Sequence, residues 1–507
     1  MVIIMYVLTA QEIKNVELIC FERYSTEAEL MFKAGEGCFK KIVEKYSNAL
    51  FHKKISVLCG NGKNAGDGFV IARLLYAHGC DAEIVLCDKF PEIAEPLMYF
   101  NQAKQSGVNI VHYNENILND SDIMIDCIFG IGFKGEPRAP FDTVFECVNK
   151  SNALVISIDT PSGTNATDAA VCKNAVKADY TIAISTLKYC HILPPSNALC
   201  GETDVIDIGI PDDCYDNNYV NTIDFDDVKS SMPVADFNAN KGSNGKLLCL
   251  CGSYHMPGAA VICCTSAVKT GAGLVNLTLP ESAYPLVASH LVQPVFHPVP
   301  DENGMYSINS LDDILDDVKN ADAVAMGCGI GVNQSTQTIC KEVLKNSKVP
   351  VILDADGINS ILPCIDILKD IKVPVVLTPH PGEMARLISK TPAEVQNNRI
   401  DIAKNFAKRY GVILVLKGAN TVVTDGETVF VNLTGNYGMA MGGTGDMLTG
   451  IISSLVAQKI DVYSACKMGV YIHGMAGDVT AKEISHRGMT VLDMTDRLGA
   501  LMSEFEV

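Results

Sequence analysis

The chain has 507 residues, a formal net charge of −19 at pH 7, and a composition that is 48% hydrophobic and 20% charged. This length exceeds what a single hydrophobic core usually organises, so we expect two domains. The negative charge repels nucleic acid and acidic membrane surfaces in the absence of a basic stripe, which leaves small molecules as the expected partners.

The nineteen cysteines are scattered through apolar runs, without the paired spacing of metal sites. Reduced, buried thiols in a cytoplasmic protein are the simplest interpretation. The apolar segment 1–5 lacks the basic leader and cleavage site of a signal peptide, and no uncharged stretch reaches membrane-spanning length. We therefore expect a soluble protein with no membrane contact.

Two helices are predicted first in the chain, over residues 9–24 and 27–46, with Thr9 and Thr26 as N-caps. Short aliphatic runs then alternate with helical patterns. The predicted strands are residues 55–59, 83–87, 123–128, 154–158 and 180–184. Continuous apolar strands separated by amphipathic helices indicate a parallel sheet covered on both faces. The N-terminal domain, residues 1–215, is therefore predicted to be a doubly wound, Rossmann-like α/β domain.

An acidic, asparagine-rich segment at residues 211–230 is expected to be an exposed connector between the domains. A second series of predicted strands covers residues 247–251, 274–279, 323–326, 351–353, 373–377 and 412–416. Two β-branched runs around Asp425-Gly426 then predict a hairpin. The second domain, residues 230–507, is thus predicted to be an α/β domain in which an antiparallel hairpin precedes a glycine-rich turn, an arrangement typical of kinases.

Three turns of the first domain place polar residues at the carboxyl ends of strands. Residues 60–68 are rich in Gly and Asn, Asp126 precedes the glycine-rich turn 130–135, and Asp159 precedes Pro161-Ser162-Gly163. Open parallel sheets bind ligands at this edge, so the three turns predict a ligand crevice.

These turns resemble the N-terminal epimerase domain of the NAD(P)H-hydrate repair enzymes, over residues 6–215. The resemblance implies that the hydrated dinucleotide contacts Lys63, Asn64, Ala65, Gly66 and Asp67, then Gly130, Ile131, Gly132, Phe133, Lys134, Gly135 and Glu136, and finally Asp159. It also implies a potassium ion held by Asn64, Asp126 and Ser162, whose oxygen donors suit a hard cation. Asp159 is the candidate acid or base at the carbinol carbon of the substrate.

Two residues depart from the pattern of this family. Lys63 replaces the first of two usual asparagines, and Lys33 lies in Met31-Phe32-Lys33-Ala34-Gly35, where the family carries Met-Glu-Asn-Ala-Gly. Lys63 adds a charge that can meet a substrate phosphate. The departures leave open a second hypothesis, in which the N-terminal half is a non-catalytic nucleotide-sensing or partner-binding module.

The segment Gly442-Gly443-Thr444-Gly445-Asp446 is the most informative stretch of the second half. Its small residues precede an apolar, helix-compatible run, which predicts a phosphate seat at a helix N-terminus with a carboxylate inside it. This pattern indicates phosphoryl transfer onto a hydroxyl that Asp446 activates. Further turns follow predicted strands at residues 252–260, 327–331, 354–359, 378–384 and 417–418 and so belong to the same sheet edge.

Together these turns closely resemble the ADP- or ATP-dependent NAD(P)H-hydrate dehydratase domain, which has a ribokinase-like fold, over residues 230–505. The string Thr378-Pro379-His380-Pro381-Gly382-Glu383-Met384-Ala385-Arg386-Leu387 is its most specific element. The resemblance implies that Ala259, Gly329, His380 and Asp446 contact the hydrated nucleotide and that Lys417, Gly418, Ala419, Asn420, Thr421 and Gly445 contact the adenine nucleotide. His380, flanked by prolines, would equally suit a role in locking a turn.

The resemblance as a whole implies an enzyme that repairs hydrated NADH and NADPH (NADHX and NADPHX). Its first half would interconvert the R and S epimers, and its second half would dehydrate the S epimer with ADP as the expected donor, releasing AMP and phosphate. Magnesium is expected with ADP or ATP, and Glu383 is a candidate ligand through water. The alternative is a ribokinase-like kinase of a small alcohol with a non-catalytic N-terminal nucleotide-binding module. A homo-oligomer is compatible with the sequence.

Overall fold

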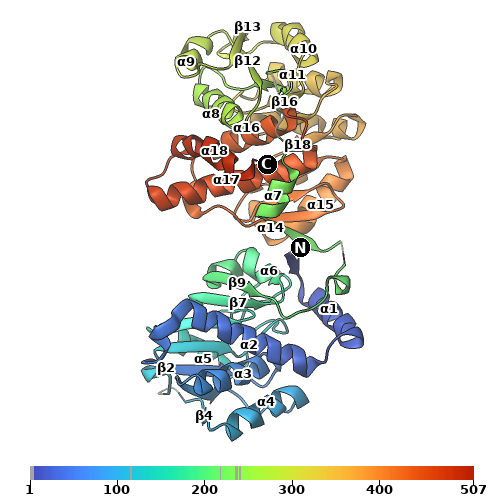
Figure 1. Ribbon diagram of the computed structural model, residues 1–507. Helices are drawn as coiled ribbons and strands as arrows, with labels where there is room; N and C mark the ends of the chain where they lie inside the picture. The colour runs from blue at the N-terminus through green and yellow to red at the C-terminus, as the bar shows by residue number, and fades with distance from the viewer. Residues whose placement is uncertain (1–4, 115–116, 217, 235–237, 239–240, 507) are drawn as a thin grey trace. The chain divides into compact units, whose positions relative to one another are not determined.

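The computed structural model describes residues 5–114, 117–216, 218–234, 238 and 241–506, and they form two units (Figure 1). The first unit covers Met5–Tyr219 and the second begins at Val220. The apolar segment 1–5 lies, except for Met5, outside the described residues.

The N-terminal unit opens with the short strand β1 (Tyr6–Leu8) and two capped helices, α1 (Ala10–Arg23) and α2 (Glu27–Tyr46). Thr9 and Thr26 each form a capping box with the glutamate three residues later. Both predicted helices and both predicted caps are therefore confirmed, because a hydroxyl and a carboxylate at this spacing satisfy two of the free N–H groups of a helix start.

A seven-stranded parallel sheet forms the centre of this unit. Its order is β4 (Asn109–His112), β3 (Asp81–Leu86), β2 (Lys54–Cys59), β5 (Ile123–Cys127), β6 (Leu154–Ile158), β7 (Tyr180–Ile184) and β9 (Glu202–Ile206). Alternate residues of β2 enter different apolar clusters, since Val57 packs on the side of α2 and α3 (Lys63–Ala77) and Leu58 on the side of α5 (Phe141–Lys150). Both faces are covered, so the doubly wound fold is confirmed.

The edge strands β4 and β9 were not predicted. Their residues are mostly exposed or half-buried, so neither strand carries the continuous apolar signal of the central strands. Residues 63–67, expected in a loop, form the first turn of α3 instead. The glycines here permit close packing rather than a turn, because a Cβ on Gly66 would lie 2.3 Å from Met31 Sδ.

The C-terminal unit is built on one long mixed sheet. Its order is β13 (Val295–Val299), β12 (Leu274–Pro280), β11 (Lys246–Leu250), β16 (Ala323–Met326), β17 (Val351–Leu353), β18 (Val375–Leu377), β19 (Ile413–Leu416), β20 (Val422–Thr424), β21 (Val429–Asn432) and β10 (Val220–Ile223). The strands from β13 to β19 pair in parallel, and β19, β20 and β21 pair antiparallel, which confirms the predicted hairpin.

Four helices cover one face of this sheet, namely α8 (Pro257–Lys269), α16 (Thr444–Ala457), α17 (Val462–Glu483) and α18 (Val491–Phe505) (Figure 1). Gly450 of α16 lets this helix approach α8, since a Cβ there would lie 2.3 Å from the Cys263 carbonyl oxygen. Helix α11 (Gln334–Asn346) packs on the opposite face, where Ile339 meets Leu250 and Met326. The second domain is therefore a three-layer α/β domain, as predicted.

The expectation of an exposed connector at residues 211–230 was wrong. Strand β10 is buried at all its positions and pairs with β21. Helix α7 (Phe225–Ser231) follows, and Asp224 caps it through the backbone N–H of Asp227. The acidic residues that suggested a linker thus begin a helix.

All nineteen cysteines are free, and most are buried, which confirms the prediction of reduced thiols. In the described part of the chain, every helix is too short or too polar to cross a membrane.

Candidate active sites of the two units

A cavity of about 770 Å³ lies at the carboxyl edge of the N-terminal sheet. The predicted residues that line it are Lys63, Asn64, Asp67, Gly130, Ile131, Gly132, Phe133, Lys134 and Asp159. Ala65 and Gly66 are buried inside α3, whereas Gly135 and Glu136 are exposed, and none of these four is part of the lining. The structure thus gathers both ends of the first predicted loop and residues 130–134 of the second around one cavity.

Asp159 lies at the end of β6 with a positive φ of 68°, which turns its side chain back toward the sheet edge. Its Oδ1 is 2.5 Å from Nζ of Lys188, a lysine that is only 1% exposed. Lys188 Nζ also donates to the carbonyl oxygens of Ile184 at 2.7 Å and Thr186 at 2.9 Å. The ammonium group is therefore fixed beside the carboxylate inside the cavity.

Sequence reasoning missed Lys188. Its signal was a single charged residue in the otherwise uncharged stretch 180–199, where burial without a partner would be too costly. His191 supports this arrangement, because its Nε2 lies 2.8 Å from the Asp159 carbonyl oxygen and its Nδ1 accepts from the Lys188 N–H. Burial, with the nearby Lys188 charge, lowers the pKa of His191 to about 4, so its imidazole is neutral.

Two further carboxyl groups, Glu17 and Asp67, line the same cavity. Burial and the charge of Asp159 raise the pKa of both groups, and that of Asp67 lies well above its usual value. Lys63 pairs with Glu27 at 2.7 Å and stays mostly exposed beside the cavity. The cavity therefore holds an ionised pair together with carboxyl groups that retain protons more readily than usual, a combination suited to proton exchange.

Of the predicted potassium ligands, Asn64 lines the cavity, whereas Asp126 and Ser162 are fully buried and are not part of the lining. Ser162 donates from its hydroxyl to Asp126 Oδ1 at 2.5 Å and from its backbone N–H to Oδ2 at 2.8 Å. Asn64 donates to the carbonyl oxygens of Phe129 and Ile158, while among the described residues its buried Oδ1 has no hydrogen-bond partner. An orphaned amide oxygen close to backbone carbonyls is a donor set that fits a hard monovalent cation.

In the C-terminal unit, α16 begins at the glycine-rich turn. Gly443 is its N-cap with a φ of 95°, and a Cβ there would lie 2.7 Å from Ile262 Cδ1. Asp446 in the first turn is mostly buried, and burial together with the Asp354 charge raises its pKa to about 6. A carboxylate with this pKa at a helix N-terminus is suited to accept a proton near neutral pH.

Lys417 and Asp354 form a buried ion pair beside Asp446. Lys417 Nζ is 2.5 Å from Asp354 Oδ1, which also accepts from the Thr378 hydroxyl at 2.7 Å. Burial by itself would raise the pKa of Asp354, but the Lys417 charge and these hydrogen bonds outweigh it, so the pKa lies below its usual value. A Cβ on Gly445 would lie 3.2 Å from Lys417 Nζ, so the ammonium reaches the predicted phosphate seat.

His380 is the N-cap of α13 (Pro381–Ile388). Its Nδ1 accepts from the Gly382 N–H at 3.0 Å, while Glu383 accepts from the His380 N–H at 2.8 Å. His380 thus locks a turn, and its half-exposed ring leaves Nε2 3.5 Å from Glu383 Oε1. Glu383 is buried and committed to this cap, which argues against the expected role as a magnesium ligand.

The remaining predicted residues of this unit are Ala259, Gly329 and the segment 417–421. Ala259 abuts Gly329, where a Cβ would lie 2.8 Å from the Ala259 Cβ. The segment 417–421 is held from behind by the fully buried Arg399, which sequence reasoning missed. Its guanidinium donates to the carbonyl oxygens of Ala419 at 2.8 Å, Leu416 at 2.9 Å and Lys417 at 3.2 Å.

Comparisons with known proteins agree with this division of the chain. The family described as NAD(P)H-hydrate dehydratase matches residues 247–499, and the family described as YjeF-related protein N-terminus matches residues 27–190. The bifunctional NAD(P)H-hydrate repair enzyme Nnr of Moorella thermoacetica is 32% identical over 99% of this chain and 97% of its own. This chain belongs to the bifunctional NAD(P)H-hydrate repair enzyme family.

A second member of the repair enzyme family also spans both halves of the chain. The enzyme of the same name from Coxiella burnetii is 32% identical over 97% of this chain and 98% of its own. A crystal structure of the ADP/ATP-dependent NAD(P)H-hydrate dehydratase from Bacillus subtilis, co-crystallised with ATP and Mg²⁺, is 30% identical and covers 55% of this chain and 96% of its own, with a TM-score of 0.48. Because the relatives match both halves, the alternative of a small-alcohol kinase with a non-catalytic N-terminal module is not supported.

Proposed function

We propose that this protein repairs NADH and NADPH that have been hydrated at the nicotinamide ring. The N-terminal unit interconverts the two epimers, and the C-terminal unit dehydrates one of them at the expense of ADP, releasing AMP and phosphate. The observation that carries the proposal is Asp446, a half-buried carboxylate with a raised pKa at the N-terminus of α16, beside the Lys417–Asp354 pair.

Epimerisation requires the bond between the hydroxyl-bearing carbon and the adjacent ring nitrogen to break and re-form on the other face. The hydroxyl loses its proton and becomes a carbonyl while the nitrogen gains a proton, and the reverse transfers close the ring. We assign Asp159 as the group that accepts the hydroxyl proton, with Lys188 holding it ionised and in place. Asp67, whose pKa is raised by burial and by the charge of Asp159, is the proton donor that this cavity offers. Potassium would be held by Asn64, Asp126 and Ser162 and would supply a positive charge beside the cavity.

Dehydration meets a different obstacle, because hydroxide is a poor leaving group at neutral pH. Asp446 takes the proton of the substrate hydroxyl, and the hydroxyl oxygen attacks the terminal phosphorus of ADP. The bond from this phosphorus to the bridging oxygen breaks, and AMP leaves. Amides of the first turn of α16 and the Lys417 ammonium stabilise the charge on the moving phosphoryl group. The phosphate then departs as the ring nitrogen donates its lone pair, and loss of a proton from the adjacent ring carbon restores the dihydronicotinamide.

The nucleotide would lie against the segment Lys417–Thr421, which Arg399 braces from below. Magnesium would neutralise the charge of the phosphates when bound. The Asp354 carboxylate is the anionic group that we propose near magnesium: its Oδ1 is used by Lys417, but a Cβ on Gly445 would lie 3.6 Å from its Oδ2, at the predicted phosphate seat.

Recovery of the dihydronicotinamide absorbance tests both halves at once. The full-length protein, given an R and S mixture of NADH hydrate, ADP and Mg²⁺, should convert all of it, and ATP in place of ADP measures the donor preference. With the Asp159→Asn protein, recovery of NADH should stop once the S epimer has been consumed. The Asp446→Asn protein should recover no NADH but should still interconvert the epimers. Full conversion by the Asp446→Asn protein would refute the assignment of this base.

A further inference from the structure

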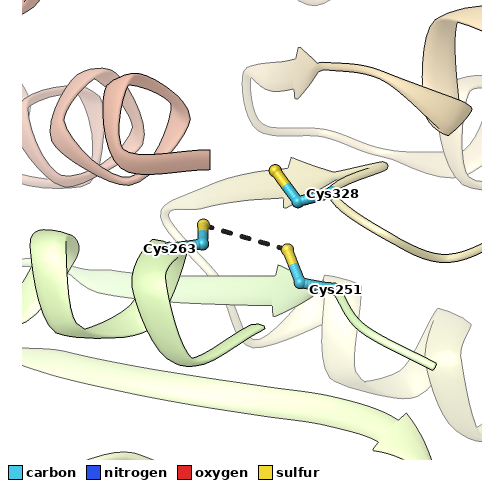
Figure 2. Close-up of side chains that lie close together, drawn as sticks. All are labelled: Cys251, Cys263 and Cys328. Carbon is cyan, nitrogen blue, oxygen red and sulfur yellow. Dashed lines mark hydrogen bonds between the residues drawn. The ribbon is translucent and has the colours of Figure 1, made fainter. Parts of the chain in front are cut away.

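Five buried cysteines gather in the C-terminal unit, between β11, α8 and β16, namely Cys249, Cys251, Cys263, Cys264 and Cys328. The Sγ atoms of Cys251, Cys263 and Cys328 all lie within 4.8 Å of one another, and those of Cys251 and Cys263 are 3.9 Å apart. Figure 2 shows these three side chains close together, on the residue that follows β11, on α8 and on the loop after β16.

The spacing of these sulfurs suits a shared metal ion. Thiolates arranged tetrahedrally around zinc at about 2.3 Å have sulfurs about 3.8 Å apart, close to the 3.9 Å between Cys251 and Cys263. A disulfide would instead need the same sulfurs at about 2.05 Å. Apolar packing alone would not require the sulfurs of three separate elements to lie within 4.8 Å of one another.

The trio also touches the catalytic carboxylates. Cys328 Sγ is 3.7 Å from Asp354 Oδ2, and Cys328, Asp354 and Asp446 form a second group whose ligand atoms lie within 4.8 Å of one another. Cys328 is therefore shared by the sulfur group and the carboxylate group, so an ion bound at this sulfur lies next to both carboxylates. Cys251 and Cys263 are fully buried, and Asp446 is mostly buried.

We propose that Cys251, Cys263 and Cys328 bind one thiophilic divalent cation of the Zn²⁺ and Cd²⁺ class. This ion also binds the Asp446 carboxylate, which can then no longer accept a proton, and so inhibits the dehydration step. A divalent ion is favoured over a monovalent one because three thiolates leave one net negative charge with it rather than two. Binding displaces three thiol protons, so the affinity increases with pH. The inhibitory part rests on the proposed function, whereas the binding part does not.

The binding part is tested on the full-length protein by titration with Cd²⁺, read as thiolate-to-cadmium charge-transfer absorbance. One ion should bind per chain with a three-sulfur signature. Cys251→Ala and Cys263→Ala should each weaken that binding by more than the roughly tenfold that loss of an outer-shell partner costs. The matched control is Cys340→Ala, a buried cysteine of α11 outside the cluster, which should bind as the parent does. Far-UV circular dichroism and thermal melting show that each variant is folded.

Equal binding by the parent and Cys263→Ala, or equal loss in the Cys340→Ala control, would overturn the site. The inhibitory part predicts that stoichiometric Zn²⁺ abolishes recovery of NADH, leaves interconversion of the epimers intact, and is reversed by a chelator. Binding without inhibition would overturn that part alone. If no dehydration is observed even without zinc, the proposed function fails, and the absorbance titration still decides the metal site.

Discussion

Replacement of Asp446 by Asn should stabilise the C-terminal unit while it abolishes dehydration. The pKa of this carboxyl is raised from 3.8 to about 6, mainly by burial. A difference of this size corresponds to about 3 kcal/mol of unfavourable free energy in the ionised folded state. Because the folded pKa lies above the unfolded one, the penalty is absent below about pH 4, grows as the pH rises to about 6, and is complete above it.

The asparagine side chain keeps the shape of the carboxylate without its charge. The variant should therefore unfold like the parent at pH 4 and be more stable by up to about 3 kcal/mol at pH 8, measured by urea denaturation of the C-terminal transition. Asp370→Asn, which removes an exposed carboxylate of the same unit, serves as the control and should change stability little at either pH. A stability difference that is the same at both pH values would refute the reasoning, because it would then not arise from ionisation.

Three other expectations follow from the same geometry. The rate of NADH recovery should rise about tenfold from pH 5 to pH 7, as Asp446 ionises through its pKa of about 6, and a flat profile would exclude it as the base. Lys188→Met should slow epimer interconversion by about a hundredfold or more, since it removes the cation beside Asp159. Dehydration of the pure S epimer should be unchanged, and an equal loss of both rates would contradict the assignment of Lys188 to epimerisation. Arg399→Met should raise the KM for ADP at least about tenfold and lower Tm, because three carbonyl groups lose their donor, and an unchanged KM would show that the segment holds its shape unaided.

The central strands and the helix starts could be predicted because their signals are local. Thr9 and Thr26 stand three residues before glutamates, and strands such as β17 and β19 are uninterrupted aliphatic runs. The turn before α16 could also be predicted from its glycines, since a left-handed backbone position such as that of Gly443 accepts few residues other than glycine.

The residues that were missed act through contacts between distant parts of the chain. Lys188 and Arg399 are charged residues in buried positions, and their partners are a carboxylate 29 positions away and backbone carbonyls that no pattern marks. The thiol trio was missed for the same reason. Its cysteines have no metal-ligand spacing in the sequence, and only the pairing of β11 with β16 brings Cys251 and Cys328 together.

The hydrogen bonds of Arg399 have a consequence for how the nucleotide is recognised. They hold the carbonyl groups of residues 416, 417 and 419 in a fixed shape through contacts within the protein itself. The loss of backbone freedom in this segment thus accompanies folding and not ligand capture. Association with ADP should then be a single fast step without a slow rearrangement. Nucleotide analogues that fit only a different conformation of this segment should bind weakly, even when they keep every polar group of ADP.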